Sequence, residues 1–346
     1  MAKLNVLPGV EPGPTYQRHA LHADSVAWTE KNCYVDVWIE VLNALRLEPR
    51  AILPSVAAID FEGDQWTFFK PSHDELFDLY GVKVNELTVW RPFRDHVVEH
   101  LAAGRLVSVE ADTFWIPDTA GIDYGRQHVK STIALASIDT EAEVATYFHN
   151  AGYFQLGGDD YRALFPDGTK GQGPEGLPFF AETIRLDGLM RLGQEELLEA
   201  TRGLWRKHLL RRPSDNPVER FARRIEADLP WLLAQGMDHY HLWAFACTRQ
   251  LGAAFELAAL NLRWMSECGE TGLAPAIEAF ESISSQAKAF VLKGARAVNS
   301  GKAFDATLLL APVAQAWSRG FEVLDDCFRV SWAASPREVA SPFQPG

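Results

Sequence analysis

Residues 31–45 read KNCYVDVWIEVLNAL, and this stretch decides how the first half of the chain is interpreted. Its apolar residues recur at spacings of three and four, which is the period of an amphipathic helix: Tyr34, Val37, Trp38, Val41, Leu42 and Leu45. Cys33 lies one turn before Val37, so the pattern places its thiol on the inward face at the helix N-terminus. The unpaired N–H groups and the helix dipole at that end favour thiolate over thiol.

Two roles for Cys33 follow from this position. Several unrelated acyl-transfer enzymes activate a cysteine nucleophile at a helix N-terminus. The commoner role of an isolated cysteine on an apolar face is that of a small buried hydrophobe. The helix alone favours the buried hydrophobe, so the choice depends on whether the rest of the sequence supplies a base.

The composition is that of a globular protein with room for two domains. The chain has 346 residues, of which 47% are hydrophobic and 23% charged. A net charge of −13 argues against general binding to nucleic acids or anionic membranes, because phosphate binding needs a basic surface.

Targeting and redox signals favour a cytoplasmic protein. We find neither a signal peptide at the N-terminus nor an apolar run long enough to span a bilayer. The four cysteines are far apart and lack CxxC spacing, which argues against a zinc site or a disulfide framework: Cys33, Cys247, Cys268 and Cys327. We therefore expect no metal and no bound cofactor.

The chain divides into two parts of different character. Residues 1–185 combine strand-like runs with helices and turns, which predicts an α+β domain. Residues 186–334 are rich in Ala, Leu and aromatic residues at helical spacing, which predicts an antiparallel helical bundle. The tail at 335–346 is expected to be loose.

Particular segments support this division. Strands are predicted at 106–111, 129–138 and 144–148, and loops at 157–160 and 166–174. Asn216-Pro217-Val218-Glu219 has the pattern of a helix start. Long helices are expected at about 240–268, 275–299 and 304–328, with Pro312 kinking or breaking the last. Their apolar residues indicate a core first and a homodimer interface second. Trp243, Phe245 and Trp264 are interpreted as core rather than as a platform for substrate.

Among the ten histidines, His128 has the setting of a general base. It begins the predicted strand at 129–138 directly after a turn-rich segment, so the sheet can fix it while it still reaches a cleft. His239 and His241 lie two residues apart, which does not bring two side chains together on a helix. We do not interpret them as a metal pair.

An imidazole base needs an orienting partner, and two residues compete for that role. Asp139 follows His128 by eleven residues, about 35 Å along a continuous strand, so we interpret it as a turn residue. Asn150 follows the strand at 144–148, and an antiparallel hairpin would return it to His128. There it could fix the imidazole tautomer. The alternative is a strand-end Asn that bonds its own turn.

The predicted triad is therefore Cys33, His128 and Asn150, in the order found in the papain-like fold. The residues around Cys33, together with DTFWIP at 112–117 and YGRQH at 124–128, resemble the N-terminal domain of the butirosin-biosynthesis acyltransferase family. The whole chain is also similar to a bacterial family of uncharacterised proteins, the domain of unknown function 1839. The glycine-rich run that follows the first helix in the acyltransferases is replaced here by FEGDQW at 61–66, which leaves the acyl group and the acceptor open.

The resemblance implies a papain-like N-terminal domain and a specific reaction. Cys33 would take an acyl or aminoacyl group from a thioester on the phosphopantetheine arm of a carrier protein. A small-molecule amine would then displace it, with His128 as the base. The oxyanion would be held by the backbone N–H of Cys33 and a second donor, either Asn32 or Gln17.

Carrier proteins are usually acidic, so docking would need a basic surface. The richest basic run is Arg202, Arg206, Lys207, Arg211 and Arg212, and the alternative is a solvated helix face. Two other functions also remain open. A hydrolase (amidase, peptidase or thioesterase) would use the same triad with water as acceptor, and an inactive binding protein would keep only the fold.

Overall fold

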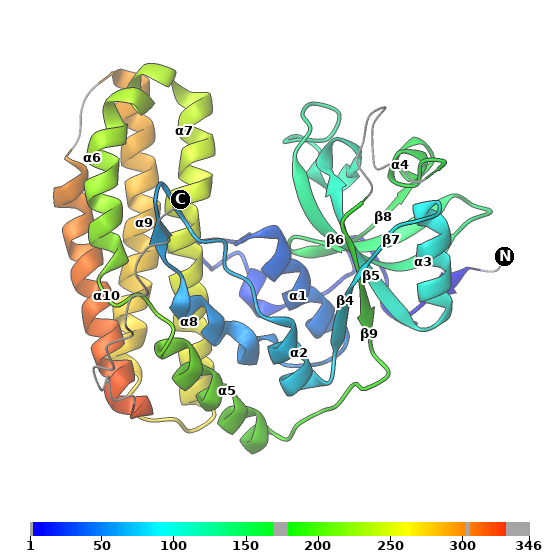
Figure 1. Ribbon diagram of the computed structural model, residues 1–346, viewed down its shortest axis with the longest axis horizontal. Helices are drawn as coiled ribbons and strands as arrows, with labels where there is room; N and C mark the ends of the chain where they lie inside the picture. Colours follow the sequence, from blue (N-terminus) through cyan, green and yellow to red (C-terminus); the bar gives the residue numbers. More distant parts are fainter. Residues whose placement is uncertain (1–2, 169–178, 302–304, 330–346) are drawn as a thin grey trace, which may run out of the picture.

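The first half of the chain forms an antiparallel sheet that is covered by helices on both faces (Figure 1). The computed structural model describes residues 3–168, 179–301 and 305–329. Strand order is β4-β9-β5-β6-β7-β8, and β1 pairs with the far end of β6. The strands are β1 (Leu4–Asn5), β4 (Lys83–Leu87), β5 (Arg105–Asp112), β6 (Lys130–Asp139), β7 (Val144–His149), β8 (Gly152–Gly157) and β9 (Ala181–Arg185). A separate small hairpin joins β2 (Phe61–Glu62) to β3 (Gln65–Trp66).

Side chains alternate between the two faces of the sheet, and each face packs against its own hydrophobic core. Leu106 and Ala134 face the core that holds α1 (Cys33–Ala44) and α2 (His73–Tyr80). Val107 and Leu135 face the core that holds α3 (Phe93–Ala102) and α4 (Asp159–Leu164). The short helices are η1 (Ala20–His22), η2 (Pro49–Ala58), η3 (Thr113–Trp115) and η4 (Pro117–Thr119).

Helix α1 has the position that its apolar period predicts. Asn32 is its N-cap, and Val37, Trp38, Val41 and Leu42 are buried in the first core. Figure 1 shows α1 between the sheet and the helical bundle. The same core continues into the bundle and includes Trp205, so one apolar interior joins both halves of the chain.

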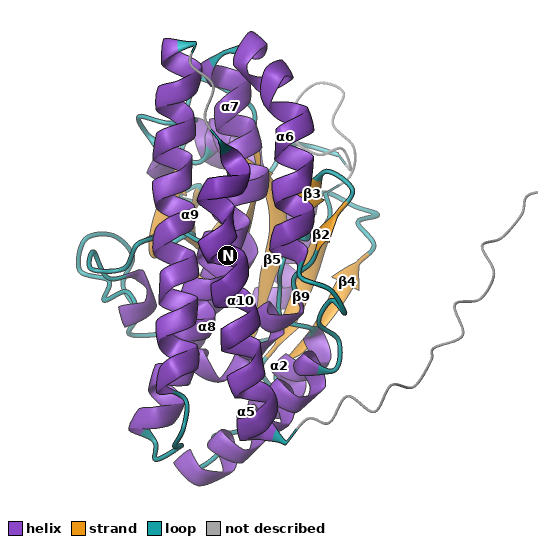
Figure 2. Cartoon of the chain, turned by 90° about the vertical axis from the view of Figure 1, so that its left-hand side faces the viewer, coloured by secondary structure: helices purple, strands orange, loops and turns teal. Residues whose placement is uncertain are grey.

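The second half consists of long helices packed side by side (Figure 2). They are α5 (Gln194–Leu209), α6 (Pro217–Gln235), α7 (Met237–Ala244), the π-helical turn η5 (Phe245–Arg249), α8 (Gln250–Glu267), α9 (Ala274–Ser300) and α10 (Ala306–Phe328). Helix α9 packs against both α8 and α10. The sequence prediction of an α+β half followed by an all-helical half is confirmed.

Some local predictions are wrong. Asp159 and Asp160 begin α4 rather than continuing a loop. Pro312 does not break the last helix, because α10 is continuous through it. Phe245 is 50% exposed rather than core. Most of the predicted loop at 166–174 and the tail at 335–346 lie outside the described residues. In the part that is described, no helix is long and apolar enough to cross a membrane.

Candidate functional site

The Cys33 thiol lies where the N-terminus of α1 meets the sheet. Cys33 is the first residue of α1 and is partly exposed. Its Sγ lies 3.7 Å from Thr132 Oγ1 on β6. Both the helical position and the inward direction of Cys33 agree with the sequence prediction.

A row of polar side chains on the same face of the sheet surrounds this contact. Thr132 Oγ1 donates to Glu110 Oε1 at 3.2 Å, and Lys130 Nζ lies 2.5 Å from Glu110 Oε2. Glu110 and Thr132 are register partners, as are Asp112 and Lys130. Because alternate residues of a strand share one face, these groups line one side of the sheet beside α1.

A second polar chain starts at the residue after Cys33. Tyr34 Oη lies 2.9 Å from His73 Nε2, which is 3.3 Å from Glu182 Oε1. Ser108 Oγ donates to Glu182 Oε2 at 3.1 Å. Burial alone would raise the pKa of the Glu182 carboxyl, but the hydrogen bond and charge of His73 outweigh it and hold that pKa below its usual value. Glu182 is therefore an anion next to the N-terminus of α1.

His128 is paired with Asp112. Its Nδ1 lies 2.5 Å from Asp112 Oδ2, and its ring stacks on Phe114 with centroids 4.5 Å apart. The His128 side chain is 69% exposed. Thr132 is four positions after His128, a span of at most about 14 Å along the chain. His128 and Cys33 thus lie at the same end of β6, with Asp112 and Thr132 as their respective partners.

Asn150 lies in the tight turn between β7 and β8, with φ of 44°. The last register pair between β6 and β7 at this end is Ala134 with Phe148. If this register is continued by two residues, Asn150 comes opposite Thr132. The hairpin therefore does not extend far enough to bring Asn150 beside His128. The carboxylate of Asp112, on the strand at the other side of β6, takes the place predicted for Asn150.

The two residues predicted as oxyanion donors are engaged elsewhere. Asn32 Oδ1 accepts from the backbone N–H of Val35, and its Nδ2 donates to the Phe69 carbonyl, each at 2.9 Å. Gln17 lies near the far end of α1, where its carbonyl accepts from Asn43. Ten residues of helix between positions 33 and 43 correspond to about 15 Å. The backbone N–H of Cys33 remains as the candidate donor.

The predicted basic docking run is largely neutralised within the chain. Arg202 pairs with Glu199 and Glu270, and Arg206 also pairs with Glu199. Lys207 lies 2.8 Å from the buried Glu75. Arg212 forms a two-fold contact with Asp325, while Arg211 is exposed. Pairing with nearby carboxylates removes most of the positive field that an acidic carrier would need.

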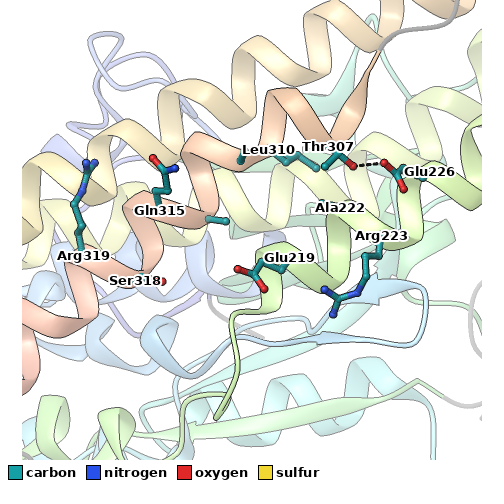
Figure 3. Close-up of a pocket in the computed structure, with 11 residues that line it drawn as sticks. Glu219, Ala222, Arg223, Glu226, Thr307, Leu310, Gln315, Ser318 and Arg319 are labelled. Atoms are coloured by element: carbon teal, nitrogen blue, oxygen red, sulfur yellow. Dashed lines mark hydrogen bonds between the residues drawn. The ribbon is translucent and has the colours of Figure 1, made fainter.

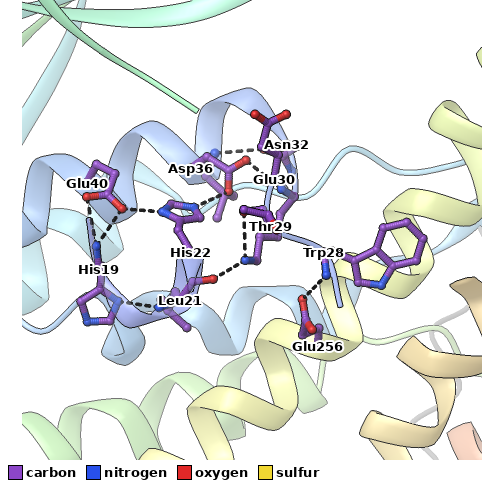
Figure 4. Close-up of polar contacts among 12 residues, drawn as sticks. His19, Leu21, His22, Trp28, Thr29, Glu30, Asn32, Asp36, Glu40 and Glu256 are labelled. Atoms are coloured by element: carbon purple, nitrogen blue, oxygen red, sulfur yellow. Dashed lines mark hydrogen bonds and ion pairs between the residues drawn. The ribbon is translucent and has the colours of Figure 1, made fainter. Parts of the chain in front are cut away.

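A buried charged cluster precedes Cys33 and was not foreseen from the sequence (Figure 4). His22 is fully buried between two residues of α1, with Nδ1 2.5 Å from Glu40 Oε1 and Nε2 3.0 Å from Asp36 Oδ1. Tyr16 Oη donates to Glu40 at 2.7 Å. Lys31 is also fully buried, and its Nζ donates to the Leu21 carbonyl. The available signal was the pair of carboxylates four residues apart on an otherwise apolar helix.

This cluster fixes the chain path into the candidate site. The backbone N–H of Lys31 donates to Asp36 at 2.8 Å. On the bundle side, the backbone N–H groups of Ala27 and Trp28 donate to Glu256 of α8 at 2.5 and 3.1 Å (Figure 4). The segment that leads to Cys33 is therefore held by α1 on one side and by the bundle on the other.

A groove on the surface of the helical bundle lies away from these residues. It has a volume of about 660 Å³ and runs between α6 and α10, where Glu226 and Thr307 are hydrogen-bonded across it (Figure 3). Its lining mixes acidic and basic residues, such as Glu219 and Arg319. Within the described part of the chain, no group of three or more His, Cys, Asp or Glu residues is arranged to hold a metal ion.

Comparison with known proteins identifies the family. No curated protein matches the chain. The model of the DUF1839 N-terminal domain matches residues 17–186, which include the Cys33 region and every strand of the sheet except β1. The model of the DUF1839 C-terminal domain matches residues 194–326, which form most of the bundle. The chain therefore belongs to the DUF1839 family.

Proposed function

We propose that the N-terminal half is a papain-like acyl-transfer unit in which Cys33 is the nucleophile and His128, held by Asp112, is the base. One observation carries the proposal. Cys33 is a partly exposed residue at the first turn of α1, and its sulfur contacts the end of the sheet that also carries the His128–Asp112 pair. A cysteine triad consists of a nucleophile, a basic ring and an orienting group. Here all three lie toward the same end of the sheet.

The proposed reaction has two steps. His128 takes the proton of the Cys33 thiol while the sulfur attacks the thioester carbonyl and a new carbon–sulfur bond forms. The carbon–sulfur bond of the donor thioester then breaks, and the donor thiol leaves with that proton from His128. An amine then attacks the acyl-enzyme, His128 takes its proton, and the Cys33 thiol is regenerated. The backbone N–H of Cys33 would stabilise the oxyanion of both steps.

His128 must move toward Cys33 for this reaction. Its ring is exposed and stacks on Phe114, so it can leave that stack without disturbing the core. The Asp112 carboxylate would have to follow the ring to keep its bond to Nδ1. Catalytic contacts are often long in a free enzyme and tighten only in the substrate complex. We therefore propose that His128 approaches Cys33 when the substrate binds.

The donor and acceptor are part of the proposal. The donor would be an acyl or aminoacyl thioester on a phosphopantetheine arm, as the resemblance to the acyltransferases implies. The acceptor would be an amine that binds as its cation and loses a proton before it attacks, because the Glu182 carboxylate places negative charge beside the Cys33 region. The neutralised basic run at 202–212 does not support carrier docking at that surface.

Product analysis tests the proposal. The protein is incubated with an aminoacyl thioester of N-acetylcysteamine, with and without a small primary amine, and both thiol release and products are measured. We expect thiol release faster than in buffer and an amide when the amine is present. Free acid in place of amide would support the hydrolase alternative. Thiol release no faster than in buffer would contradict acyl transfer.

The orienting residue can be identified by two matched variants. Asp112→Asn keeps the shape of the side chain but offers His128 the wrong partner, so we expect turnover to fall by roughly 10²–10⁴-fold. Asn150→Gly suits the positive φ of the turn and should leave turnover within about two-fold. The check is the pH profile of kcat for both variants. Loss of turnover in Asn150→Gly alone would restore Asn150 as the orienting residue.

A further inference from the structure

A second nucleophile cluster lies on the opposite face of β6. Ser131 Oγ is 2.7 Å from His149 Nε2, and His149 Nδ1 is 2.7 Å from Asp118 Oδ2. The three residues come from the start of β6, the end of β7 and the short helix η4. They belong to the face away from α1, since Ser131 and Thr132 are neighbours that point to opposite sides of the strand.

We infer that Ser131, His149 and Asp118 form a serine nucleophile site that is separate from Cys33. The two ring nitrogens of His149 face a hydroxyl on one side and a carboxylate on the other. This is the arrangement in which an imidazole accepts a serine proton while a carboxylate fixes its tautomer. The His149 ring therefore has the orientation that proton transfer from Ser131 needs, which a purely structural histidine does not require.

The surroundings hold this cluster firmly. Tyr147 Oη donates to the other oxygen of Asp118 at 2.6 Å, so both carboxylate oxygens have a partner. Asp118 is followed by Thr119, whose Oγ1 donates to the Thr113 and Ile116 carbonyls at 3.2 and 2.9 Å. These bonds fix the segment that carries Asp118. The positioning shell that a catalytic histidine needs is therefore present.

Access and surroundings define the substrate class. His149 is only 1% exposed, whereas Ser131, near the start of β6, is 7% exposed. Buried apolar residues of the second core, including Ala111, Ile116 and Ile133, lie on this face. A nearly buried serine with apolar neighbours fits a small, uncharged acyl ester. Ser131 Oγ would attack its carbonyl, His149 would take the serine proton, and the same proton would leave with the alcohol.

The test is labelling with diisopropyl fluorophosphate, a small reagent that captures activated serines. A bond forms between Ser131 Oγ and phosphorus, fluoride leaves, and His149 takes the serine proton. We expect a single adduct on the full chain, mapped to Ser131 by peptide mass spectrometry. The adduct should be absent in Ser131→Ala and should form at least about 10²-fold more slowly in His149→Gln.

Two controls show whether the label reports on this site or on another nucleophile. Ser137 is a second buried serine on β6, 2.6 Å from Thr146 Oγ1 with no histidine partner in that contact, so Ser137→Ala should keep full labelling. Cys33→Ala should also keep it, because the two sites are on opposite faces of the sheet. An unlabelled wild-type protein overturns the inference whether or not the variants fold. Equal labelling rates in wild type and His149→Gln overturn it as well.

Discussion

Cys33→Ala is expected to lower thioester turnover by at least roughly 10³-fold, because it removes the atom that would form the acyl-enzyme. Stability should change by only about 1 kcal/mol or less, since Cys33 is partly exposed and its polar contact with Thr132 is long at 3.7 Å. The measurement is thiol release from the N-acetylcysteamine thioester, together with urea unfolding of both proteins. The combination of lost turnover and retained stability is what distinguishes a nucleophile from a core thiol.

The matched control is Cys268→Ala. Cys268 is another partly exposed free cysteine, located at the end of α8 in the bundle. Its replacement should leave turnover within about two-fold, which excludes a general effect of losing a thiol. Turnover that survives in Cys33→Ala would assign the reaction to another residue.

His22→Leu is expected to be the most destabilising of the proposed substitutions, at about 3–5 kcal/mol. Asp36 and Glu40 are fully buried on the same helix, and His22 bonds to both. Without the imidazolium, Lys31 is the cation that remains among the described residues of this buried cluster, and it faces two carboxylates. Urea unfolding at pH 6 measures the loss.

Two further variants test whether charge balance is the cause. His22→Leu combined with Glu40→Gln removes one charge of each sign, so part of the lost stability should return. His239 is exposed on α7, and His239→Leu should change stability by about 0.5 kcal/mol or less. If Glu40→Gln lowers the free energy of unfolding in the His22→Leu protein as much as it does in the wild type, charge balance is not the cause.

The contribution of His22 should also depend on pH in a defined direction. Burial opposes its charge, but the hydrogen bonds to Asp36 and Glu40 and the charge of Asp36 outweigh burial and raise the pKa of His22 above the usual value of 6.5. Its stabilising effect is therefore complete below pH 6.5 and is lost as pH rises through the raised folded-state pKa. For Glu40, burial alone would raise the pKa, but the bonds from His22 and Tyr16 lower it below 4.5. Its contribution is present above pH 4.5 and is lost at lower pH, so the cluster should stabilise most between these values.

Patterns with a strong period predicted their elements well. The apolar spacing in 31–45 identified α1, and β-branched alternation identified β5, β6 and β7. Asp139 was correctly interpreted as a turn residue, since its Oδ1 accepts from the backbone N–H groups of Glu141 and Ala142. These features depend on neighbours within a few residues, which a single sequence contains.

Contacts between distant segments could not be predicted in the same way. Asn150 was placed beside His128 from strand order alone, whereas the β6–β7 register ends before that point. Asp112 and Asp118 meet their histidines through pairing and loop folding that leave no periodic signal. Phe245 is exposed because the π-helical turn at Phe245–Arg249 shifts the apolar face of the helix.

Peptide mass spectrometry tests most directly whether Cys33 carries the acyl group, on which the proposed function depends. Wild-type protein is mixed with the aminoacyl thioester in the absence of amine, quenched in acid and digested. We expect a mass increase of one acyl group, located on the peptide that contains Cys33 and removed when amine is added before the quench. An unmodified Cys33, or an acyl group found only on another residue, would contradict the proposed role of Cys33.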